Sequence, residues 1–359
     1  MKRNVKIHVD PQALLHNVRR IRNYAPDSKI LAMVKANAYG HGAKQVSAIL
    51  AEAVDAFGVA YVEEGAALRA SGLTKPIVVM AGFNDSEELA GCAAHQLDIV
   101  VHQLWQIDLL EQSNAHGVFN IWLKIDSGMH RLGVLPQEFA IALERLQALT
   151  NVGQIRLMSH FGCASERTND KTNQQITLYH NIIGDTALER SLANSAAVIA
   201  WPDSHHEWVR PGIMLYGVSP FSDYTAEELD LRPVMTASSK IIAVRRCLAG
   251  DEIGYGAAYR CPEDMPVAVV AVGYGDGCYP RQVLQAIPVL INQRPAQVLG
   301  RVSMDSIVVD LRQHQGVNVG DEVMLWGPGL PVEHIAKLSG RSAYELLCLA
   351  GNSIFAYHI

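Results

Sequence analysis

The sequence predicts an α/β fold in which an N-terminal (β/α)8 barrel of the TIM type is joined to a C-terminal all-β domain. The chain has 359 residues, more than one core ordinarily holds, and 49% of them are hydrophobic, as a large interior requires. Up to about residue 230, short apolar runs alternate with longer segments of helical periodicity, which is typical of parallel strands with crossover helices. We therefore predict a barrel over residues 1–230 and a mostly β domain over residues 231–359.

The barrel segment contains eight candidate strands, the number that closes a (β/α)8 barrel. They lie at residues 30–34, 56–60, 77–80, 98–101, 121–125, 155–159, 191–193 and 207–209. Helices are predicted at residues 11–23, 43–53, 63–70, 86–95, 103–113, 137–149 and 171–183. The first helix has a clear start signal, because Asp10 can cap it and Pro11 occupies the first helical position, where a missing N–H costs nothing.

The C-terminal segment is predicted to be a separate β domain. Its candidate strands lie at residues 240–244, 266–272, 289–291, 306–311 and 322–325, with glycine and proline turns between them. The join near residues 231–233 is a soft boundary.

Composition excludes several functional classes. A net charge of −6 and a pI near 6.2 lack the basic surplus that a nucleic-acid partner requires. The start of the sequence has no apolar segment of signal-peptide type, and no apolar run approaches about 18 residues, so neither export nor membrane insertion is expected. The six cysteines show no CxxC spacing, which argues against a metal site or a disulfide framework. We expect a cytoplasmic protein that acts on a small molecule.

Polar residues with chemical potential follow the predicted barrel strands, where barrel enzymes place their reactive groups. They are Lys35, Lys124, Asp126, Arg131, His160, Asn194, Ser195 and Arg210. Each alone has a structural alternative, such as a satisfied core position for His160, an ion pair for Arg210 or a turn for Asn194. Their regular placement together favours an active site.

The segment VKANAYGHG at residues 34–42 is the most informative of these places. Lys35 directly follows an apolar strand, where desolvation can lower the pKa of its amine and free the lone pair for attack on a carbonyl. Gly40 and Gly42 allow close backbone approach, and Tyr39 offers a hydroxyl that can reach a phosphate. An ordinary solvated lysine is the alternative for Lys35 taken alone.

This nonapeptide resembles the pyridoxal-phosphate attachment site of alanine racemases, and the resemblance extends over nearly the whole chain. The other matching segments are KIDSGMHRLG at 124–133, SHF at 159–161, WVRPGIMLYG at 208–217, GYG at 254–256, GYGDG at 273–277, GRVSMD at 300–305 and SAYELL at 342–347. The resemblance implies that Lys35 carries pyridoxal 5'-phosphate as an internal aldimine. It also implies a homodimer in which Tyr255 of the other subunit faces Lys35, so that two bases on opposite faces of the substrate invert its α-carbon.

The resemblance assigns the remaining site residues as well. Arg210 would face the pyridine nitrogen and leave it unprotonated, since arginine does not act as an acid in proteins, and His160 would link Arg210 to the catalytic tyrosine. The cofactor would be held further by Tyr39, Asn194, Ser195, Gly212, Ile213 and Tyr344. The substrate carboxylate would meet Arg131 with Met304 and Asp305 of the partner chain, Tyr274 would line the entrance, and Lys124, which is often carbamylated in the family, would hold Arg131 in place.

Two features depart from the family pattern, and alternatives stay open. Cys278 is an extra residue after GYGDG, and the C-terminal NSIFAYHI lacks the usual RVPR-type ending. The alternatives are a broader amino-acid racemase, a decarboxylase of the same fold, in which a carboxylate normally faces the pyridine nitrogen, and a non-catalytic cofactor carrier, which would lack the β domain. The sequence does not distinguish a biosynthetic racemase, which makes D-alanine for peptidoglycan, from a catabolic one.

Overall fold

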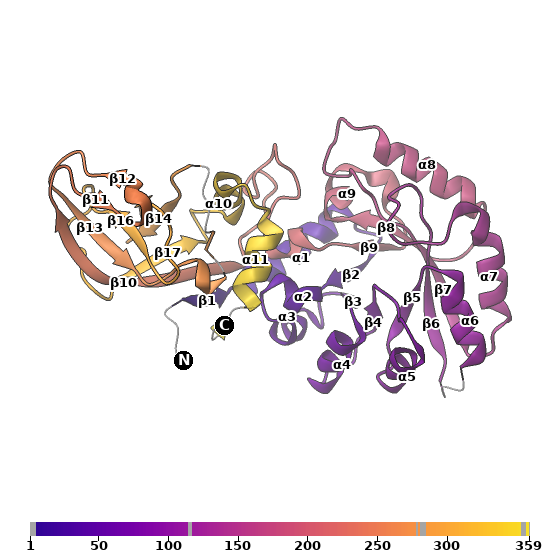
Figure 1. Cartoon of the computed structure of the whole chain (residues 1–359). Coiled ribbons are helices and arrows are strands. Elements are labelled where there is room, and N and C mark those ends of the chain that lie inside the picture. The colour runs from indigo at the N-terminus through magenta and orange to yellow at the C-terminus, as the bar shows by residue number, and fades with distance from the viewer. Residues whose placement is uncertain (1–4, 114–116, 278, 281–284, 353–356, 359) are drawn as a thin grey trace.

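The computed structural model describes residues 5–113, 117–277, 279–280, 285–352 and 357–358 (Figure 1). Cys278 and most of the atypical C-terminus therefore lie outside the described residues. The barrel and the β domain lie side by side, and helices of the C-terminal segment stand between them (Figure 1). Within the described residues, none of the helices is both long and apolar enough to span a bilayer.

The N-terminal part is a closed barrel of eight parallel strands, which confirms the predicted fold class. The strands are β2 (Lys29–Met33), β3 (Ala56–Val59), β4 (Ile77–Val79), β5 (Asp98–Val101), β6 (Phe119–Lys124), β7 (Val152–Met158), β8 (Arg190–Asn194) and β9 (Trp208–Arg210). Pairing of Lys29 with Trp208 and of Ile30 with Val209 closes the ring. All eight predicted strands are confirmed, with ends that differ by at most three residues.

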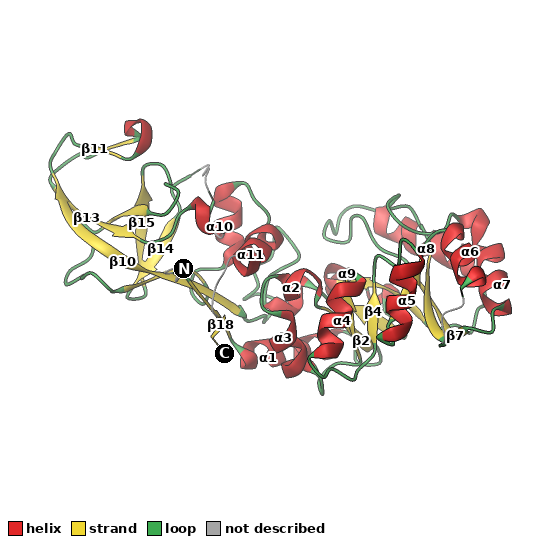
Figure 2. Ribbon diagram, turned by 60° about the horizontal axis from the view of Figure 1, so that its bottom comes forward, coloured by secondary structure: helices red, strands yellow, loops and turns green. Residues whose placement is uncertain are grey.

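Helices surround the barrel (Figure 2). They are α1 (Pro11–Tyr24), α2 (Lys35–Tyr39), α3 (Ala43–Leu50), α4 (Val62–Ala70), α5 (Ser86–Ala94), α6 (Leu104–Gln112), α7 (Phe139–Ala148), α8 (Lys171–Ile183) and α9 (Ser195–Ala200). The seven predicted helices are confirmed, and the short α2 and α9 were not predicted. Asp10 caps α1 as expected, since its Oδ1 accepts hydrogen bonds from the amides of Gln12 at 2.8 Å and Ala13 at 3.1 Å.

The C-terminal part is built on an eight-stranded sheet, nearly all of it antiparallel. Its strands are β1 (Lys6–Val9), β10 (Met235–Cys247), β13 (Met265–Val270), β14 (Pro288–Ile291), β15 (Arg294–Leu299), β16 (Ile307–Asp310), β17 (Glu322–Trp326) and β18 (Tyr357–His358). The short pair β11 (Glu252–Ile253) and β12 (Tyr259–Arg260) stands apart, and α10 (Val332–Ser339) and α11 (Ala343–Asn352) follow β17.

The first strand pairs with a strand near the other end of the chain. β1 pairs antiparallel with β10 and parallel with β18, so residues 6–9 belong to the sheet of the β domain. The barrel begins only after α1. The division at residues 230 and 231 remains a proposal.

Large apolar side chains fill the barrel interior. A cluster drawn from seven of its eight strands comprises Leu31, Ala56, Val78, Val100, Trp122, Met158 and Trp208. The Arg156 guanidinium stacks over the rings of Trp122 at 5.1 Å and Trp208 at 5.4 Å. Because the interior is packed in this way, side chains at the carboxyl ends of the strands are left to line an open site.

Candidate active site

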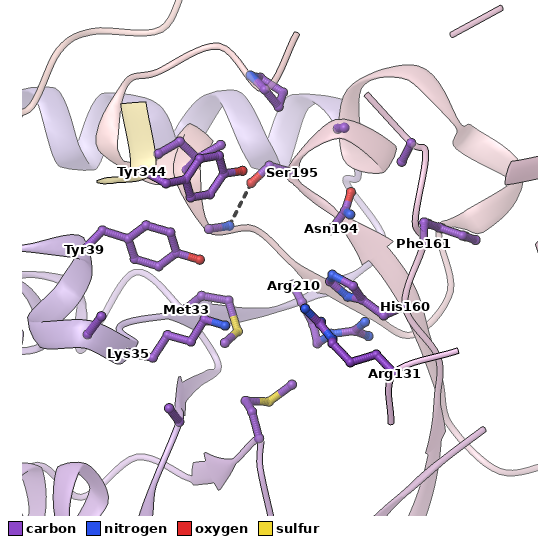
Figure 3. A pocket seen from close by; sticks show the side chains of 18 of the residues that line it. Met33, Lys35, Tyr39, Arg131, His160, Phe161, Asn194, Ser195, Arg210 and Tyr344 are labelled. Atoms are coloured by element: carbon purple, nitrogen blue, oxygen red, sulfur yellow. Dashed lines mark hydrogen bonds between the residues drawn. The ribbon is translucent and has the colours of Figure 1, made fainter. Parts of the chain in front are cut away.

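A cavity of about 660 Å³ opens at the carboxyl ends of the barrel strands (Figure 3). Helix α11 from the C-terminal segment supplies Tyr344 and Cys348 to its wall. The predicted site residues that line it are Lys35, Tyr39, Lys124, Arg131, His160, Asn194, Ser195, Arg210, Gly212, Ile213 and Tyr344. The fold thus brings together residues that are far apart in the sequence, from position 35 to position 344.

Lys35 directs its amine into this cavity (Figure 3). Burial, and secondly the positive charge of Arg131, lower the pKa of the Lys35 amine, whereas the carboxylate of Glu64 acts in the opposite direction. A lowered pKa enlarges the fraction of neutral amine at physiological pH, and only the neutral amine has a lone pair for bonding.

The backbone after Lys35 turns in the left-handed sense. Residues 36 to 39 all have positive φ, between 51° and 56°, a region that costs an L-residue about 1–2 kcal/mol. Local hydrogen bonds offset this cost: the Ala38 amide donates to the Val34 carbonyl at 2.8 Å, and Asn37 accepts from the amides of Gly42 and Ala43, each at 2.9 Å. The turn places both Lys35 and Tyr39 on the cavity wall. Strained backbone of this kind concentrates at functional sites.

Arg210, at the end of β9, is a buried cation held by neutral oxygens. Its Nη1 donates to the Ser191 carbonyl and hydroxyl, both at 2.6 Å, and its Nη2 donates to the carbonyls of Ser159 and Leu192. In the described part of the chain, no carboxylate pairs with it. Burial lowers the pKa of Arg210 to about 10, so it stays charged at neutral pH. The cavity therefore contains a fixed guanidinium with defined orientation.

Positive charge accumulates around His160 and Lys124. Burial, followed by the charges of Arg210, Lys124, Arg131 and Lys35, lowers the pKa of His160 well below its usual value, so its imidazole is neutral at pH 7. Burial and the same arginines lower the pKa of Lys124 to about 7, and the side chain is only 7% exposed. This half of the cavity suits an anionic group.

Hydroxyl groups gather at the opposite end of the cavity. The Ser195 Oγ, at the start of α9, accepts from the amide of Gly212 at 2.8 Å (Figure 3). It also accepts from the amide of Met214 at 3.4 Å. The rings of Tyr39 and Tyr344 lie 5.8 Å apart, and burial raises the pKa of Tyr344 to about 12 and that of Tyr39 further. Both phenols are therefore protonated donors at neutral pH. Asn194 is occupied as the cap of α9, since its Oδ1 accepts from the Ala197 amide at 3.1 Å.

Four of the five predicted residues beyond position 230 do not line this cavity; Tyr344 is the one that does. Tyr255, between β11 and β12, is 70% exposed, and Met304 is 54% exposed. Tyr274 and Met304 belong to neighbouring loops, because the Tyr274 amide donates to the Ser303 carbonyl at 3.1 Å and the Gly275 amide to the Met304 carbonyl at 2.8 Å. The next residue, Asp305, is exposed in the same loop. β11 and β12 lie at the end of the β domain that is far from the barrel (Figure 1).

The cavity also contains residues that the sequence analysis did not select. Met80 directly follows β4, and Tyr61 lies two residues after the end of β3, so the strand-end pattern that identified Lys35 could have identified both. Cys348 reaches the cavity through the docking of α11 and had no local signal in the sequence. Among the described residues, no group of histidine, cysteine and acidic side chains is arranged to hold a metal ion.

Comparison with known proteins gives a consistent result. Residues 9–220 match the alanine racemase N-terminal domain and residues 234–356 match the alanine racemase C-terminal domain. The chain is 48% identical over 340 residues to the alanine racemase of Aliivibrio salmonicida, with 94% of each chain covered. It is 47% identical over 343 residues to that of Photobacterium profundum, with 95% of each covered.

Solved structures agree with these relatives. The crystal structure of biosynthetic alanine racemase from Pseudomonas aeruginosa superposes with a TM-score of 0.93 at 39% identity, covering 99% of this chain and 100% of that one. The alanine racemase structure from Acinetobacter baumannii gives a TM-score of 0.90 at 36% identity, with both chains fully covered. Since both domain families match and the relatives are similar over nearly the full length, the chain belongs to the alanine racemase family.

Proposed function

We propose that this chain interconverts L-alanine and D-alanine, with pyridoxal 5'-phosphate as its cofactor and as a homodimer with shared active sites. The observation that carries the proposal is the meeting, in one cavity, of an amine of lowered pKa, a buried guanidinium without a carboxylate partner among the described residues, and a set of protonated hydroxyls. The relatives named above, which are alanine racemases, support the same reaction.

The residues of the cavity fit this cofactor. A Cβ on Gly212 would lie 2.5 Å from the Tyr39 hydroxyl, so only glycine leaves this hollow open. Around it, Tyr39, Ser195, Gly212, Ile213 and Tyr344 supply hydroxyl and amide donors that would hold a phosphate. Lys35 would bind the cofactor covalently, Asn194 would line the site as the cap of α9, and Arg210 would face the ring nitrogen.

The protein's own groups then move and hold protons. When bound, pyridoxal 5'-phosphate supplies the electron sink that makes the α-proton of an amino acid acidic. Lys35 can accept or return a proton at Nζ, because burial and Arg131 lower the pKa of its amine and so favour the neutral form. Arg210 keeps its protons at neutral pH and therefore orients a ring nitrogen without protonating it. His160, neutral beside Arg210, would connect Arg210 to the second base.

The second base in this proposal is Tyr255 of the partner subunit. Inversion requires a proton to leave one face of the α-carbon and another to arrive on the opposite face, which two bases on opposite sides achieve directly. The exposure of Tyr255 and its distance from its own barrel support a role in a neighbouring chain. The partner's Tyr274, Met304 and Asp305 would complete the site in the same way.

Arg131 would bind the substrate carboxylate, since a guanidinium fork matches a carboxylate in geometry and charge. Lys124 would hold Arg131 through a carbamate on its amine. A pKa of about 7 supports this assignment, because the neutral amine is the form that reacts with carbon dioxide. The resulting anion would also offset the positive charges around it.

A decarboxylase of the same fold is disfavoured by Arg210 itself, because such an enzyme is expected to have a carboxylate, and not a guanidinium, facing the pyridine nitrogen. A carrier on a barrel alone is disfavoured by the β domain.

We propose a biosynthetic role, in which D-alanine serves as a peptidoglycan precursor in the cytoplasm. Similarity to the biosynthetic enzyme of Pseudomonas aeruginosa supports it.

A purified preparation loaded with pyridoxal 5'-phosphate tests the proposal. L-Alanine should be converted to an equal mixture of both enantiomers, as followed by chiral chromatography, and a panel of other L-amino acids should racemise at least about tenfold more slowly. Equal rates across the panel would indicate the broader racemase, and release of carbon dioxide would indicate the decarboxylase.

A further inference from the structure

Glu64, on helix α4, makes two contacts that connect the Lys35 segment to the neighbouring barrel strand. Its Oε1 accepts a hydrogen bond from the Ala36 amide at 2.7 Å, and its Oε2 accepts one from the Ala60 amide at 2.6 Å. Ala36 directly follows Lys35, and Ala60 directly follows β3. One carboxylate thus binds the backbone beyond the carboxyl ends of two adjacent strands, β2 and β3.

The geometry explains why a carboxylate is needed there. β2 and β3 pair in parallel through Met33 and Gly58, and the Val34 amide still donates to the Gly58 carbonyl at 2.8 Å. At Ala36 the left-handed turn begins, and the chain leaves the ladder. Two amides, those of Ala36 and Ala60, then face the same space, and two donors cannot bond to each other. An ionised carboxylate accepts from both.

We propose that Glu64 is a positioning residue for Lys35: by tying the first amide of the left-handed turn to the end of β3, it sets the direction in which the Lys35 side chain enters the cavity. This inference rests on the proposed function, because it concerns how accurately Lys35 is placed for proton transfer. Displacement of a reacting group by about 1 Å costs up to about a hundredfold in rate. The same carboxylate also raises the pKa of the Lys35 amine, whereas Arg131 lowers it.

Glu88 on α5 provides a matched control within the same barrel. It is the third residue of its helix, as Glu64 is of α4, and its carboxylate accepts from the amide four residues before it, Asn84, at 2.8 Å. Among the described residues, the other hydrogen bonds of its carboxylate are with the Asn84 side chain and none is with a neighbouring strand end. Removing Glu88 therefore removes a helix-start contact of the same kind and leaves the Lys35 segment untouched.

The test compares wild type with Glu64→Ala, Glu64→Gln and Glu88→Ala, all loaded with pyridoxal 5'-phosphate. Hydrogen–deuterium exchange in residues 34–42 should accelerate at least about tenfold in Glu64→Ala, because the Ala36 amide loses its acceptor. The kcat for L-alanine should fall about tenfold to a hundredfold, with KM changed by less than about threefold. Glu64→Gln should be intermediate, since one amide oxygen replaces two carboxylate oxygens. Glu88→Ala should match wild type in both measurements.

Unchanged exchange in residues 34–42 of Glu64→Ala, or an equal loss of kcat in Glu88→Ala, would overturn the positioning role. If Glu64→Ala does not fold, Glu64→Gln decides the question by the same two measurements. A wild type without racemase activity would instead overturn the proposed function, and the exchange comparison would still show whether Glu64 holds the turn.

Discussion

Lys35 shows how surroundings decide the chemistry of one side chain. Burial and Arg131 lower the pKa of its amine, and the left-handed turn directs it into the cavity. We predict that Lys35→Ala abolishes retention of pyridoxal 5'-phosphate and lowers racemisation at least about a thousandfold, since the covalent attachment and one base are both lost. Visible absorbance after exhaustive dialysis measures the first effect. Lys29→Ala, which alters a lysine paired with Glu189 at the other end of β2, should keep the absorbance.

His41, in the same segment, should make the stability of the fold depend on pH. It is buried against Tyr216, with ring centroids 4.4 Å apart, and burial lowers its pKa to about 4. In the unfolded chain an imidazole titrates near pH 6.5, so the unfolded state binds the proton first as the pH falls. The contribution of His41 to stability should be complete above about pH 6.5 and be lost on acidification toward pH 4.

Denaturant unfolding of wild type and His41→Gln at a series of pH values checks this prediction. The difference in unfolding free energy between the two proteins should shrink by about 3 kcal/mol from pH 7 to pH 4, because one pKa unit corresponds to about 1.4 kcal/mol. A difference that does not vary with pH would show that the His41 pKa is close to its usual value.

At the scale of elements, the packing of α2 against α11 decides whether Tyr344 reaches the cavity. A Cβ on Gly40 would lie 2.0 Å from the Leu347 carbonyl oxygen, and Gly40 has a φ of 83°. Gly40→Ala should therefore displace α11 as well as strain the turn. Gly72, with a φ of 92° and open space around it, is the matched control for strain alone.

We expect Gly72→Ala to lower the unfolding free energy by about 1–2 kcal/mol and Gly40→Ala to lower it by about 1–3 kcal/mol more, from overpacking. Chemical denaturation measures both losses. Affinity for pyridoxal 5'-phosphate should fall only in Gly40→Ala, because Tyr344 moves with α11. Equal losses in the two variants would contradict the role of close packing at Gly40.

Elements were predictable from the sequence wherever local pattern decides them. The barrel strands are short apolar runs with helical segments between them, so all eight were found. β15 (Arg294–Leu299) was missed, because Arg294, Pro295 and Gln297 interrupt its apolar pattern. The left-handed turn was missed for another reason: Ala36 and Ala38 have no preference for positive φ, and their conformation depends on contacts with distant residues.

The same contrast between local pattern and contacts with distant residues applies to the candidate site. The strand-end pattern was sufficient to find Lys35, Arg131 and Arg210, because parallel strands bring their carboxyl ends together. The bridge from Glu64 to Ala36 spans 28 positions in the chain and needs the curvature of the barrel, which no local pattern records.

At the scale of the whole molecule, one chain carries two separated halves of the proposed machinery. Lys35 lines the barrel cavity, whereas Tyr255 is exposed between β11 and β12 at the far end of the β domain (Figure 1). A symmetric dimer would bring the half-site of one chain to the complementary half of the other. The two halves can therefore be inactivated separately and recombined.

Mixing two inactive proteins tests this arrangement. Lys35→Ala homodimers and Tyr255→Phe homodimers should each be inactive, but a heterodimer contains one site with both an intact lysine and an intact tyrosine. After unfolding and refolding of an equal mixture with pyridoxal 5'-phosphate, about a quarter of wild-type activity should return, because half of the dimers are mixed and each has one working site of two. A mixture that stays inactive, while wild type refolds to full activity under the same conditions, would show that Lys35 and Tyr255 act within one chain or not at all.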